Sequence, residues 1–333
     1  DIQNGKPSGH GVMFDCSASG MQLLSIITGD ANGARISNVT GQDITDPYLE
    51  LYKVMQEKVG QSVAIDRDDL KQAIMTSLYG SEAEPQKLFA GVSLEAFYET
   101  MEQEIPNCWE LNQFFIDFQK TSTALSYDWV MPDNFHVHCP VTEVIEQSVS
   151  CLGSNHLVAT KVNQAHGRNR SLGANTVHSI EAFIARELIR RCSFNDNEKI
   201  DALLNGDKYV GMNQEDWDMC QTLWDLYKKS GFLSARILDH VGTQALDFID
   251  KDEIYKVWCT TTDKPFAIKA IHDCFSCHPN YAKGMLDTYR ELYALLSESN
   301  ILEYILKQSI DPEIKLNVTS MADDIRKSVY ILS

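Results

Sequence analysis

The spacing of apolar and polar positions divides the first part of the chain into one short strand and several amphipathic helices. Residues 11–14 form an apolar run that predicts a strand, followed by a turn and a helix that begins near Ser19. Residues 47–59 place apolar side chains at helical spacing and predict a helix with one buried face. Residues 67–80 predict another helix, with Gly80 in the position that ends helices. Further helices and loops are expected to follow.

The second part of the chain adds two predicted hairpins to a mostly helical pattern. Residues 141–162 are rich in strand-forming side chains and turn near residues 152–155, which indicates a β-hairpin. Residues 266–279 indicate a strand, a tight turn and a second strand. Helical segments are expected at residues 174–192, 193–264 and 281–307, before an apolar tail at residues 329–332. The expected fold class is therefore α+β, predominantly helical, with a small antiparallel sheet.

Composition and charge describe a globular protein rather than a membrane or disulfide-rich one. Of the 333 residues, 44% are hydrophobic and 23% are charged. No run approaches the roughly 18 uncharged apolar residues that a membrane helix needs. Nine cysteines, an odd number without regular spacing, favour a reducing compartment. The net charge of -18 argues against nucleic-acid binding unless a local basic cleft or a partner chain supplies positive surface.

Two aspartates at predicted strand ends are the first candidates for chemistry. Asp15 follows the first apolar run, and Asp273 follows the run at residues 266–272. Two carboxylates at strand ends, if the fold brings them together, can share a pair of divalent cations. Two metal ions held in this way can catalyse phosphoryl transfer.

A basic helix lies between these aspartates in the sequence. Arg67 and Lys71 are four residues apart, which places them about 6 Å apart along one helix face. Two positively charged side chains at this spacing can bind the phosphates of a nucleotide. Tyr79 stays on the same broad face of the helix. The alternative interpretation is a solvated basic edge on an amphipathic helix.

The motifs that contain these residues resemble those of the bacteriophage and mitochondrial single-subunit RNA polymerases. Residues 67–81 (RDDLKQAIMTSLYGS) resemble the second polymerase motif of that family, with its spacing intact. Residues 15–22 (DCSASGMQ) resemble the first motif, and residues 271–275 (IHDCF) resemble the third, with Cys274 where serine is usual. Further similarity is found at residues 129–135 (WVMPDNF), 174–179 (ANTVHS) and 324–328 (DIRKS). The similarities occur in order over most of the chain.

The resemblance implies a polymerase right-hand fold and a nucleotidyltransferase that makes RNA on a DNA template. It implies that Asp15, Asp273 and the backbone carbonyl of Cys16 bind two Mg²⁺ ions, which suit carboxylate, phosphate and water ligands. It also implies that Arg67 and Lys71 hold the triphosphate. Lys71 would in addition protonate the leaving pyrophosphate.

The same resemblance implies how the sugar and base are recognised. Tyr79 would pack against the incoming base and take part in sugar selection, and His178 would lie near the minor groove and the ribose. Gly20 occupies the place where the related A-family DNA polymerases carry a glutamate that blocks the 2′-hydroxyl. Glycine leaves that space open, so ribonucleoside triphosphates are the expected substrates. The alternative for Gly20 is a simple turn requirement.

By the same resemblance the chain divides into palm and fingers. The implied subdomains are palm at 1–35, fingers with the nucleotide-binding helix at 36–126, palm with the hairpin and the His178 helix at 127–192, a helical insertion at 193–264, and the palm hairpin with C-terminal helices at 265–333. The hairpin near residues 141–162 lies where relatives place a promoter-reading loop, but it is poor in arginine, so a structural ribbon is the alternative. The insertion is either a docking surface for an accessory factor or a decoration.

The expected partners follow from what the chain lacks relative to the family. Family members carry a large N-terminal domain, a thumb and an Asp-x-x-Gly-Arg motif ahead of the first polymerase motif, and this chain begins shortly before Asp15. Either that upstream portion was removed, or a second polypeptide supplies it. The acidic charge favours the second alternative, so we expect a heterodimer, together with DNA template, RNA product and an accessory promoter-recruitment factor. No membrane is expected. A phage-encoded enzyme of this kind would work in the host cytoplasm.

Two other functions compete with this interpretation. An A-family-like DNA polymerase would share the metal site, but Gly20 and residues 79–81 weigh against it. A catalytically inactive polymerase-like binding subunit would keep the fold, but retention of the aspartates and the basic helix weighs against it. The run at residues 274–278 (CFSCH) matches haem and zinc patterns, yet it follows the third motif directly and is interpreted as part of the hairpin. His136 and His138 alternate on a probable strand and are expected to be surface histidines.

Overall fold

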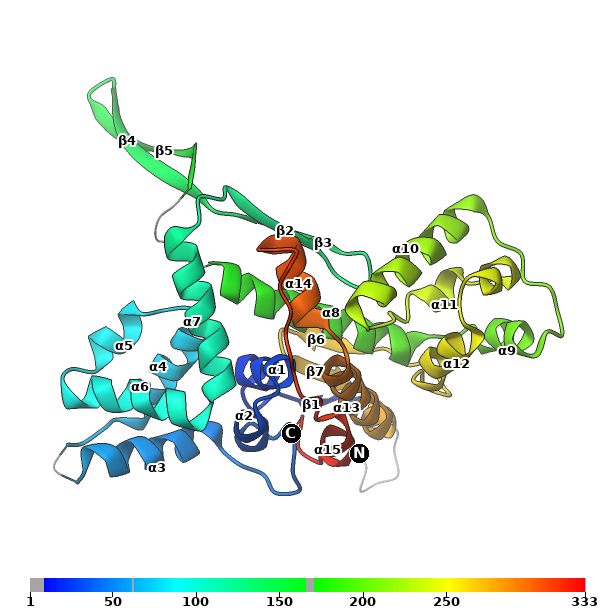
Figure 1. Cartoon of the computed structure of the whole chain (residues 1–333), viewed down its shortest axis with the longest axis horizontal. Coiled ribbons are helices and arrows are strands. Elements are labelled where there is room, and N and C mark those ends of the chain that lie inside the picture. The colour runs from blue at the N-terminus through cyan, green and yellow to red at the C-terminus, as the bar shows by residue number, and fades with distance from the viewer. Residues whose placement is uncertain (1–8, 62, 166–170, 333) are drawn as a thin grey trace.

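The computed structural model describes residues 9–61, 63–165 and 171–332. In this part of the chain the helix content is 57%, in 15 α-helices, and the strands form three small antiparallel sheets (Figure 1). The predicted α+β, predominantly helical class is thereby confirmed. The subdomain boundaries remain predictions, and residues 1–8, 166–170 and 333 within them lie outside the described residues.

A three-stranded sheet joins the two ends of the chain. Strand β1 (Val12–Phe14) pairs with β7 (Cys274–Cys277), which pairs with β6 (Lys269–Ile271). The predicted strand, turn and strand between residues 266 and 279 is confirmed. Ile271 pairs with Cys274, so His272 and Asp273 form a two-residue turn. His272 has a φ of 54°, the left-handed conformation that tight hairpin turns require.

Helix α1 (Ser19–Thr28) lies at the centre of the main core, and its predicted start at Ser19 is confirmed. It packs against α7 (Pro106–Thr121), α8 (Ser171–Ser193) and α13 (Ala282–Glu298). Leu23 and Ile26 are fully buried. Each aliphatic side chain buried in this way contributes about 1.5–3 kcal/mol. The helix begins four residues after Asp15.

Five helices form one side of the molecule, and their ends follow local sequence signals. They are α3 (Pro47–Val59), α4 (Arg67–Leu78), α5 (Ala83–Leu88), α6 (Val92–Glu104) and α7, with the short α2 (Ala31–Ile36) beside α1 (Figure 1). Asp46 caps the start of α3, and Asp66 caps the start of α4 through the amides of Asp68 and Asp69. Gly80 follows α4 with a φ of 89°. The predicted helices at 47–59 and 67–80 are therefore confirmed.

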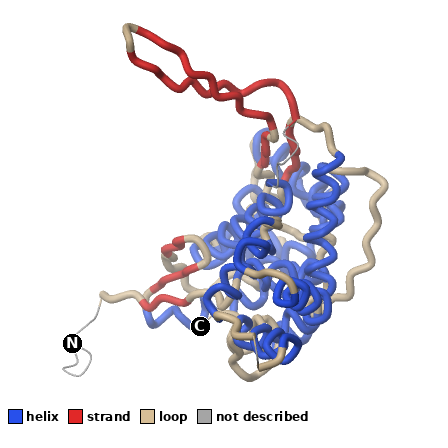
Figure 2. Tube along the Cα trace, turned by 90° about the vertical axis from the view of Figure 1, so that its left-hand side faces the viewer, coloured by secondary structure: helices blue, strands red, loops and turns tan. Residues whose placement is uncertain are grey.

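A long two-stranded ribbon projects from the body of the protein. Strands β4 (Thr142–Cys151) and β5 (Ser154–Ala165) pair around a turn at Leu152 and Gly153, which confirms the predicted hairpin (Figure 2). Every residue from Val144 to Thr160 is exposed. At its base lies a second hairpin, β2 (Ser126–Val130) and β3 (His136–Pro140). The alternative roles for the ribbon, promoter reading or structural support, stay predictions.

Trimming this ribbon is expected to leave the fold intact. Joining Ile145 to Thr160 through Asn-Gly, in place of residues 146–159, keeps the register because Ile145 and Thr160 are paired. The thermal unfolding midpoint should change by less than about 2 °C, since the removed residues are exposed. Differential scanning calorimetry of the two chains tests this. A fall of more than about 5 °C would mean that the ribbon supports the body.

Helices between residues 197 and 259 form a smaller body with its own core. They are α9 (Asn197–Asn205), α10 (Gln214–Ser230), α11 (Ile237–His240), the 3₁₀ turn η2 (Thr243–Asp247) and α12 (Lys251–Cys259). A second cluster of buried apolar side chains, including Ile200, Leu223 and Ile254, fills this body. It lies beyond the C-terminal end of α8 (Figure 1).

A buried ion pair ties this smaller body to α8. Glu187 and Arg191 are both fully buried and lie 3.1 Å apart. Glu187 also accepts hydrogen bonds from the Ser234 hydroxyl and, at 2.9 Å, from the backbone N–H of Ala235. Arg191 donates to the hydroxyl of Thr260. Because both charges are removed from water, each needs the other for the fold to be stable.

The C-terminal tail returns to the beginning of the chain. After the 3₁₀ turn η3 (Pro279–Tyr281) and α13 come α14 (Ile301–Ser309) and α15 (Ala322–Lys327). Leu332 forms a bridge with Cys16, and the buried Gln22 side chain donates to the carbonyl of Ile331 at 3.1 Å. The predicted apolar tail thus packs beneath the turn between β1 and α1. None of the helices in the described residues is long and apolar enough to cross a membrane.

Candidate functional site

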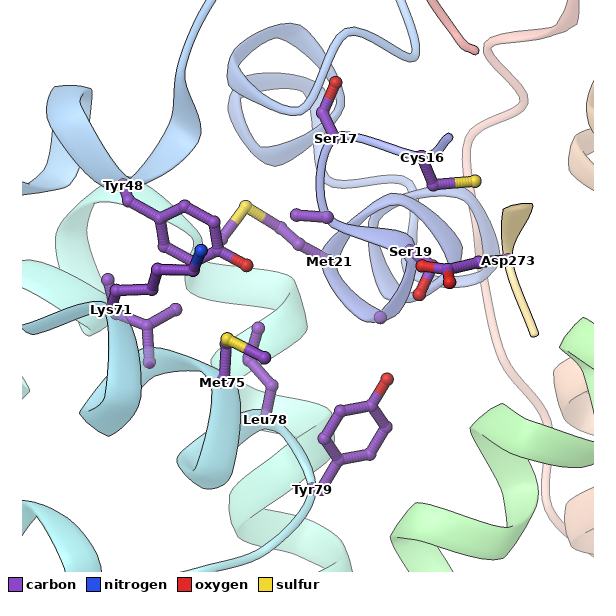
Figure 3. Close-up of a pocket in the computed structure, with 13 residues that line it drawn as sticks. Cys16, Ser17, Ser19, Met21, Tyr48, Lys71, Met75, Leu78, Tyr79 and Asp273 are labelled. Atoms are coloured by element: carbon purple, nitrogen blue, oxygen red, sulfur yellow. The ribbon is translucent and has the colours of Figure 1, made fainter. Parts of the chain in front are cut away.

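A cavity of about 210 Å³ lies where β1, α1, α3, α4 and the β6–β7 turn meet (Figure 3). Five of the residues singled out from the sequence line it: Cys16, Gly20, Lys71, Tyr79 and Asp273. Asp273 lies on one side and Lys71 on the other. The cavity is smaller than most ligand sites, which measure about 300–1,000 Å³. It can therefore enclose only part of a nucleoside triphosphate.

The strand register places the two candidate aspartates at one end of the same strand pair. Phe14 lies opposite Phe275 in the β1–β7 ladder. Asp15 follows the last paired residue of β1, and Asp273 lies in the turn just before β7, so both aspartates lie at the same end of this strand pair. Asp273 lines the cavity, whereas Asp15 lies outside its lining. Burial is the main cause that raises the pKa of the Cys16 thiol, and the charges of both aspartates raise it further. Residues distant in sequence therefore meet here.

The chemistry of this pair fits a divalent cation. Among the described residues neither Asp15 nor Asp273 forms an ion pair with a lysine, arginine or histidine, and Asp15 is exposed. Its Oδ1 accepts from the N–H of Cys16 at 3.0 Å. Oxygen ligands open to water suit Mg²⁺, which keeps several waters and shares phosphate oxygens. The described residues contain no group of three or more His, Cys, Asp and Glu side chains that could hold a metal, so phosphate, backbone and water would complete the coordination.

The Cys16 side chain is directed away from this pair. Its sulfur lies 3.2 Å from the hydroxyl of Tyr289, which in turn donates to Tyr293 at 2.6 Å. The thiol is therefore engaged in the core beneath the site. The backbone carbonyl of Cys16 stays the predicted metal ligand at this position.

Of the two positively charged side chains predicted to bind phosphate from α4, only one lines the cavity. The Nζ atom of Lys71 lies 5.3 Å from the ring centre of Tyr48 on α3, an attractive cation–π contact. Arg67 lies one turn earlier and outside the cavity lining, in an ion pair with Asp46. Both partners are more than 40% exposed, so this pair contributes at most about 1 kcal/mol.

Tyr79 fills the space that Gly20 leaves. A Cβ atom added to Gly20 would lie 2.7 Å from the Tyr79 hydroxyl oxygen, closer than real contacts allow. Gly20 lies in the first turn of α1, and its φ is not in the left-handed region. The alternative that this glycine serves a turn is therefore wrong. The ring of His178, on α8, lies 5.0 Å from the Tyr79 ring, centre to centre.

Replacing Gly20 with alanine is expected to displace the Tyr79 ring, because overpacking of this kind costs about 1–3 kcal/mol. With the ribonucleotide substrate that the resemblance implies, kcat/KM should fall about tenfold. The loss should shrink in a Tyr79→Phe background, which removes the clashing oxygen. Single-nucleotide incorporation by the four proteins of this cycle measures the effect. Equal losses in both backgrounds would contradict the contact.

Burial raises the pKa of the Tyr79 phenol to about 12, and the charge of Glu181 raises it while a hydrogen bond from Ser19 lowers it. The protonated phenol therefore persists well above the ordinary tyrosine pKa of about 10. We expect the preference for ribonucleotides to stay constant from neutral pH to about 10. Incorporation ratios measured across this range check it. A preference that fell with a midpoint near the ordinary value would show that the phenol is not buried.

Three residues that line or adjoin the site were missed by sequence reasoning. Tyr48 stacks on Lys71, and no motif marks it. Ser19 lines the cavity, and its hydroxyl opposes the rise that burial causes in the pKa of Tyr79 and of Glu181. Glu181 lies three residues after His178 on α8, a spacing that places both on one helix face and that the sequence does show.

The cysteine and histidine patterns elsewhere form no comparable site. Cys274 and Cys277 lie three positions apart on β7, so their side chains point to opposite faces of the sheet and cannot converge on one metal. The Nδ1 atom of His138 lies 2.6 Å from Asp128 across the β2–β3 pair. This histidine is occupied by a surface contact.

Comparison with known proteins adds no assignment. No protein-family model and no curated protein matches this chain.

Proposed function

We propose that the chain is the catalytic palm-and-fingers subunit of a phage-type DNA-directed RNA polymerase, which joins ribonucleoside triphosphates on a DNA template. The proposal is supported by the β1–β7 register, which brings the segments that carry Asp15 and Asp273 to one end of a strand pair, and by the cavity that Asp273, Lys71 and Tyr79 line. In this assignment the β1–β7–β6 sheet with α1, α8 and α13 is the palm. Helices α3 to α7 are the fingers.

Each side chain has a role that its position supports. Asp15 and Asp273 would hold two Mg²⁺ ions, which when bound activate the RNA 3′-hydroxyl and neutralise the pyrophosphate. The 3′-oxygen attacks the α-phosphorus as the bond to pyrophosphate breaks. Lys71 binds the triphosphate and gives a proton to the leaving pyrophosphate. Arg67 joins it after exchange with Asp46.

Tyr79 and His178 form the side of the site that faces base and ribose. Their rings lie against each other at the junction of α4 and α8. An incoming base can stack on the Tyr79 ring, and the phenol is free to meet the sugar because it keeps its proton. These contacts favour a nucleotide over a simple phosphate ligand.

The charge of the chain supports a partner. A net charge of -18 repels nucleic acid, so a second polypeptide that carries the N-terminal and thumb portion would supply positive surface. An accessory promoter-recruitment factor would contact the insertion or the β4–β5 ribbon. The assembled enzyme would act in the cytoplasm of a host cell.

Primer extension by the complex purified from its native source tests the proposal. With Mg²⁺ and a primed DNA template, we expect ribonucleotides to be added at least about a hundredfold more efficiently than deoxyribonucleotides, a difference of about 2.7 kcal/mol. A preference for deoxyribonucleotides would favour an A-family-like DNA polymerase. Template binding without synthesis of either polymer would favour an inactive binding subunit.

A further inference from the structure

We propose that Asp46 is a positioning residue for nucleotide selection, which competes with the incoming triphosphate for Arg67 and so favours phosphate chains long enough to reach past Lys71. The inference rests on the proposed function and adds to it a residue outside the motifs. Asp46 lies just before α3, and neither Asp46 nor Arg67 lines the cavity. The effect of Asp46 on a ligand in the cavity must therefore pass through Arg67.

The two oxygens of the Asp46 carboxylate have different partners. Oδ1 accepts hydrogen bonds from the backbone N–H groups of Tyr48, at 3.0 Å, and Leu49, at 3.1 Å, and so caps α3. Oδ2 accepts a hydrogen bond from the Arg67 guanidinium at the start of α4 and forms an ion pair with it. The cap fixes the carboxylate on α3, so the first turns of the two helices are joined through this one side chain.

The two positively charged side chains of α4 differ in what a phosphate must displace. Lys71 contacts an aromatic ring, with its Nζ atom 5.3 Å from the ring centre of Tyr48 (Figure 3), and among the described residues it forms no ion pair. Arg67 is paired with Asp46 and lies 3.8 Å from Asp68, whose side chain is 90% exposed and holds it weakly. A phosphate therefore reaches Lys71 without displacing an anion, and it reaches Arg67 only by taking the place of Asp46.

The spacing of these side chains determines which ligands can make the exchange. Arg67 lies one helical turn before Lys71, about 6 Å along the axis of α4. A single phosphate bound at Lys71 gains nothing when the Asp46–Arg67 pair opens. A triphosphate can contact both side chains, so its binding at Lys71 helps to offset the loss of the pair. The pair is exposed and therefore weak enough to exchange. The arrangement favours a triphosphate over a shorter phosphate.

The test compares Asp46→Asn with Asp250→Asn in the full chain, by calorimetric titration with inorganic tripolyphosphate and with orthophosphate in the absence of divalent metal. Asparagine caps helices as well as aspartate does, so Asp46→Asn keeps the cap of α3 and removes the charge that holds Arg67. Asp250 caps α12 in the smaller body, where the same substitution makes an equal change in net charge. We expect Asp46→Asn to tighten tripolyphosphate binding about fivefold, the effect of one exposed ion pair, and to leave orthophosphate binding unchanged. Asp250→Asn should change neither.

An Arg67→Ala background shows whether the effect passes through Arg67. There, Asp46→Asn should give no further gain in tripolyphosphate affinity. The same gain with both probes, or the same gain without Arg67, would overturn the inference, because Asp46 would then act only through net charge. A tripolyphosphate affinity that is unchanged by Asp46→Asn, or undetectable in both proteins, would overturn it as well.

Kinetics of the native complex separate this inference from the proposed function. Asp46→Asn should lower the KM for a ribonucleoside triphosphate about fivefold with little change in kcat, since it alters binding and not the reaction. A fall in kcat without a fall in KM would give Asp46 a purely structural role and contradict the inference. The expected tripolyphosphate result without RNA synthesis by the wild type would leave the competition standing and remove the proposed function. RNA synthesis by the wild type, with no change in tripolyphosphate affinity in Asp46→Asn, would refute the competition alone.

Discussion

Replacing Asp273 with alanine is expected to lower RNA synthesis by the proposed enzyme at least about a thousandfold, because it would remove one of the two carboxylates proposed to hold the catalytic cations. Asp273 lies in the two-residue turn between β6 and β7, and its side chain is partly exposed. Its loss therefore removes chemistry and little packing. Primer extension under single-turnover conditions measures the rate.

The matched control is Asp263→Ala, an exposed aspartate in the loop after α12. It should keep the wild-type rate, and both variants should unfold within about 2 °C of the wild type, as surface changes do. An Asp273→Ala enzyme that kept more than a tenth of its activity would show that this carboxylate is not part of the reaction. The binding-subunit alternative would then be favoured.

Replacing Glu187 with alanine is expected to destabilise the protein by about 3–5 kcal/mol, because it leaves the buried cation of Arg191 without its carboxylate. Burial already lowers the pKa of Arg191, which shows how poorly the site solvates a charge. The Glu187→Ala substitution also removes the hydrogen-bond acceptor of the Ser234 hydroxyl and of the Ala235 backbone N–H. The thermal unfolding midpoint should fall by roughly 5–10 °C.

Glu50→Ala is the control for this prediction, since Glu50 forms an exposed pair with Lys53. It should change stability by less than about 1 kcal/mol. Circular dichroism melting of the wild type and both variants checks the difference. A Glu187→Ala protein as stable as the control would mean that water reaches Arg191 and that the pair does not fasten the smaller body to α8.

Local signals explain why the helices could be predicted from the sequence. Asp46 and Pro47 mark the start of α3. Asp66 marks the start of α4 and Gly80 follows its end. The bounds of these helices therefore follow from their capping residues. The β6–β7 turn was also predictable, because two polar residues separate two apolar runs. These features depend only on neighbours along the chain.

Contacts between distant segments could not be predicted in the same way. Gly20 could be recognised as important, but the phenol of Tyr79 above it comes from another helix. Arg67 was expected to face the phosphates, yet the cap of α3 places Asp46 within its reach. The strand-forming residues and the turn near residues 152–155 predicted the hairpin of β4 and β5, but they do not show whether a face of the ribbon is covered. Here both faces are exposed.

The site shows the same division between local and distant information. Asp15, Lys71 and Asp273 were found because motifs and strand ends mark them. Glu181 was missed because the charges near it, that of Asp273 among them, come from a distant part of the chain. Tyr48 was missed because its contact with Lys71 depends on how α3 and α4 pack.

The most direct measurement is the position of Mn²⁺, used in place of Mg²⁺, in crystals of the native complex soaked with a non-hydrolysable ribonucleoside triphosphate. The account predicts anomalous scattering peaks between the carboxylates of Asp15 and Asp273, and their loss in Asp273→Ala. Peaks that lie elsewhere, or that persist without Asp273, would contradict it.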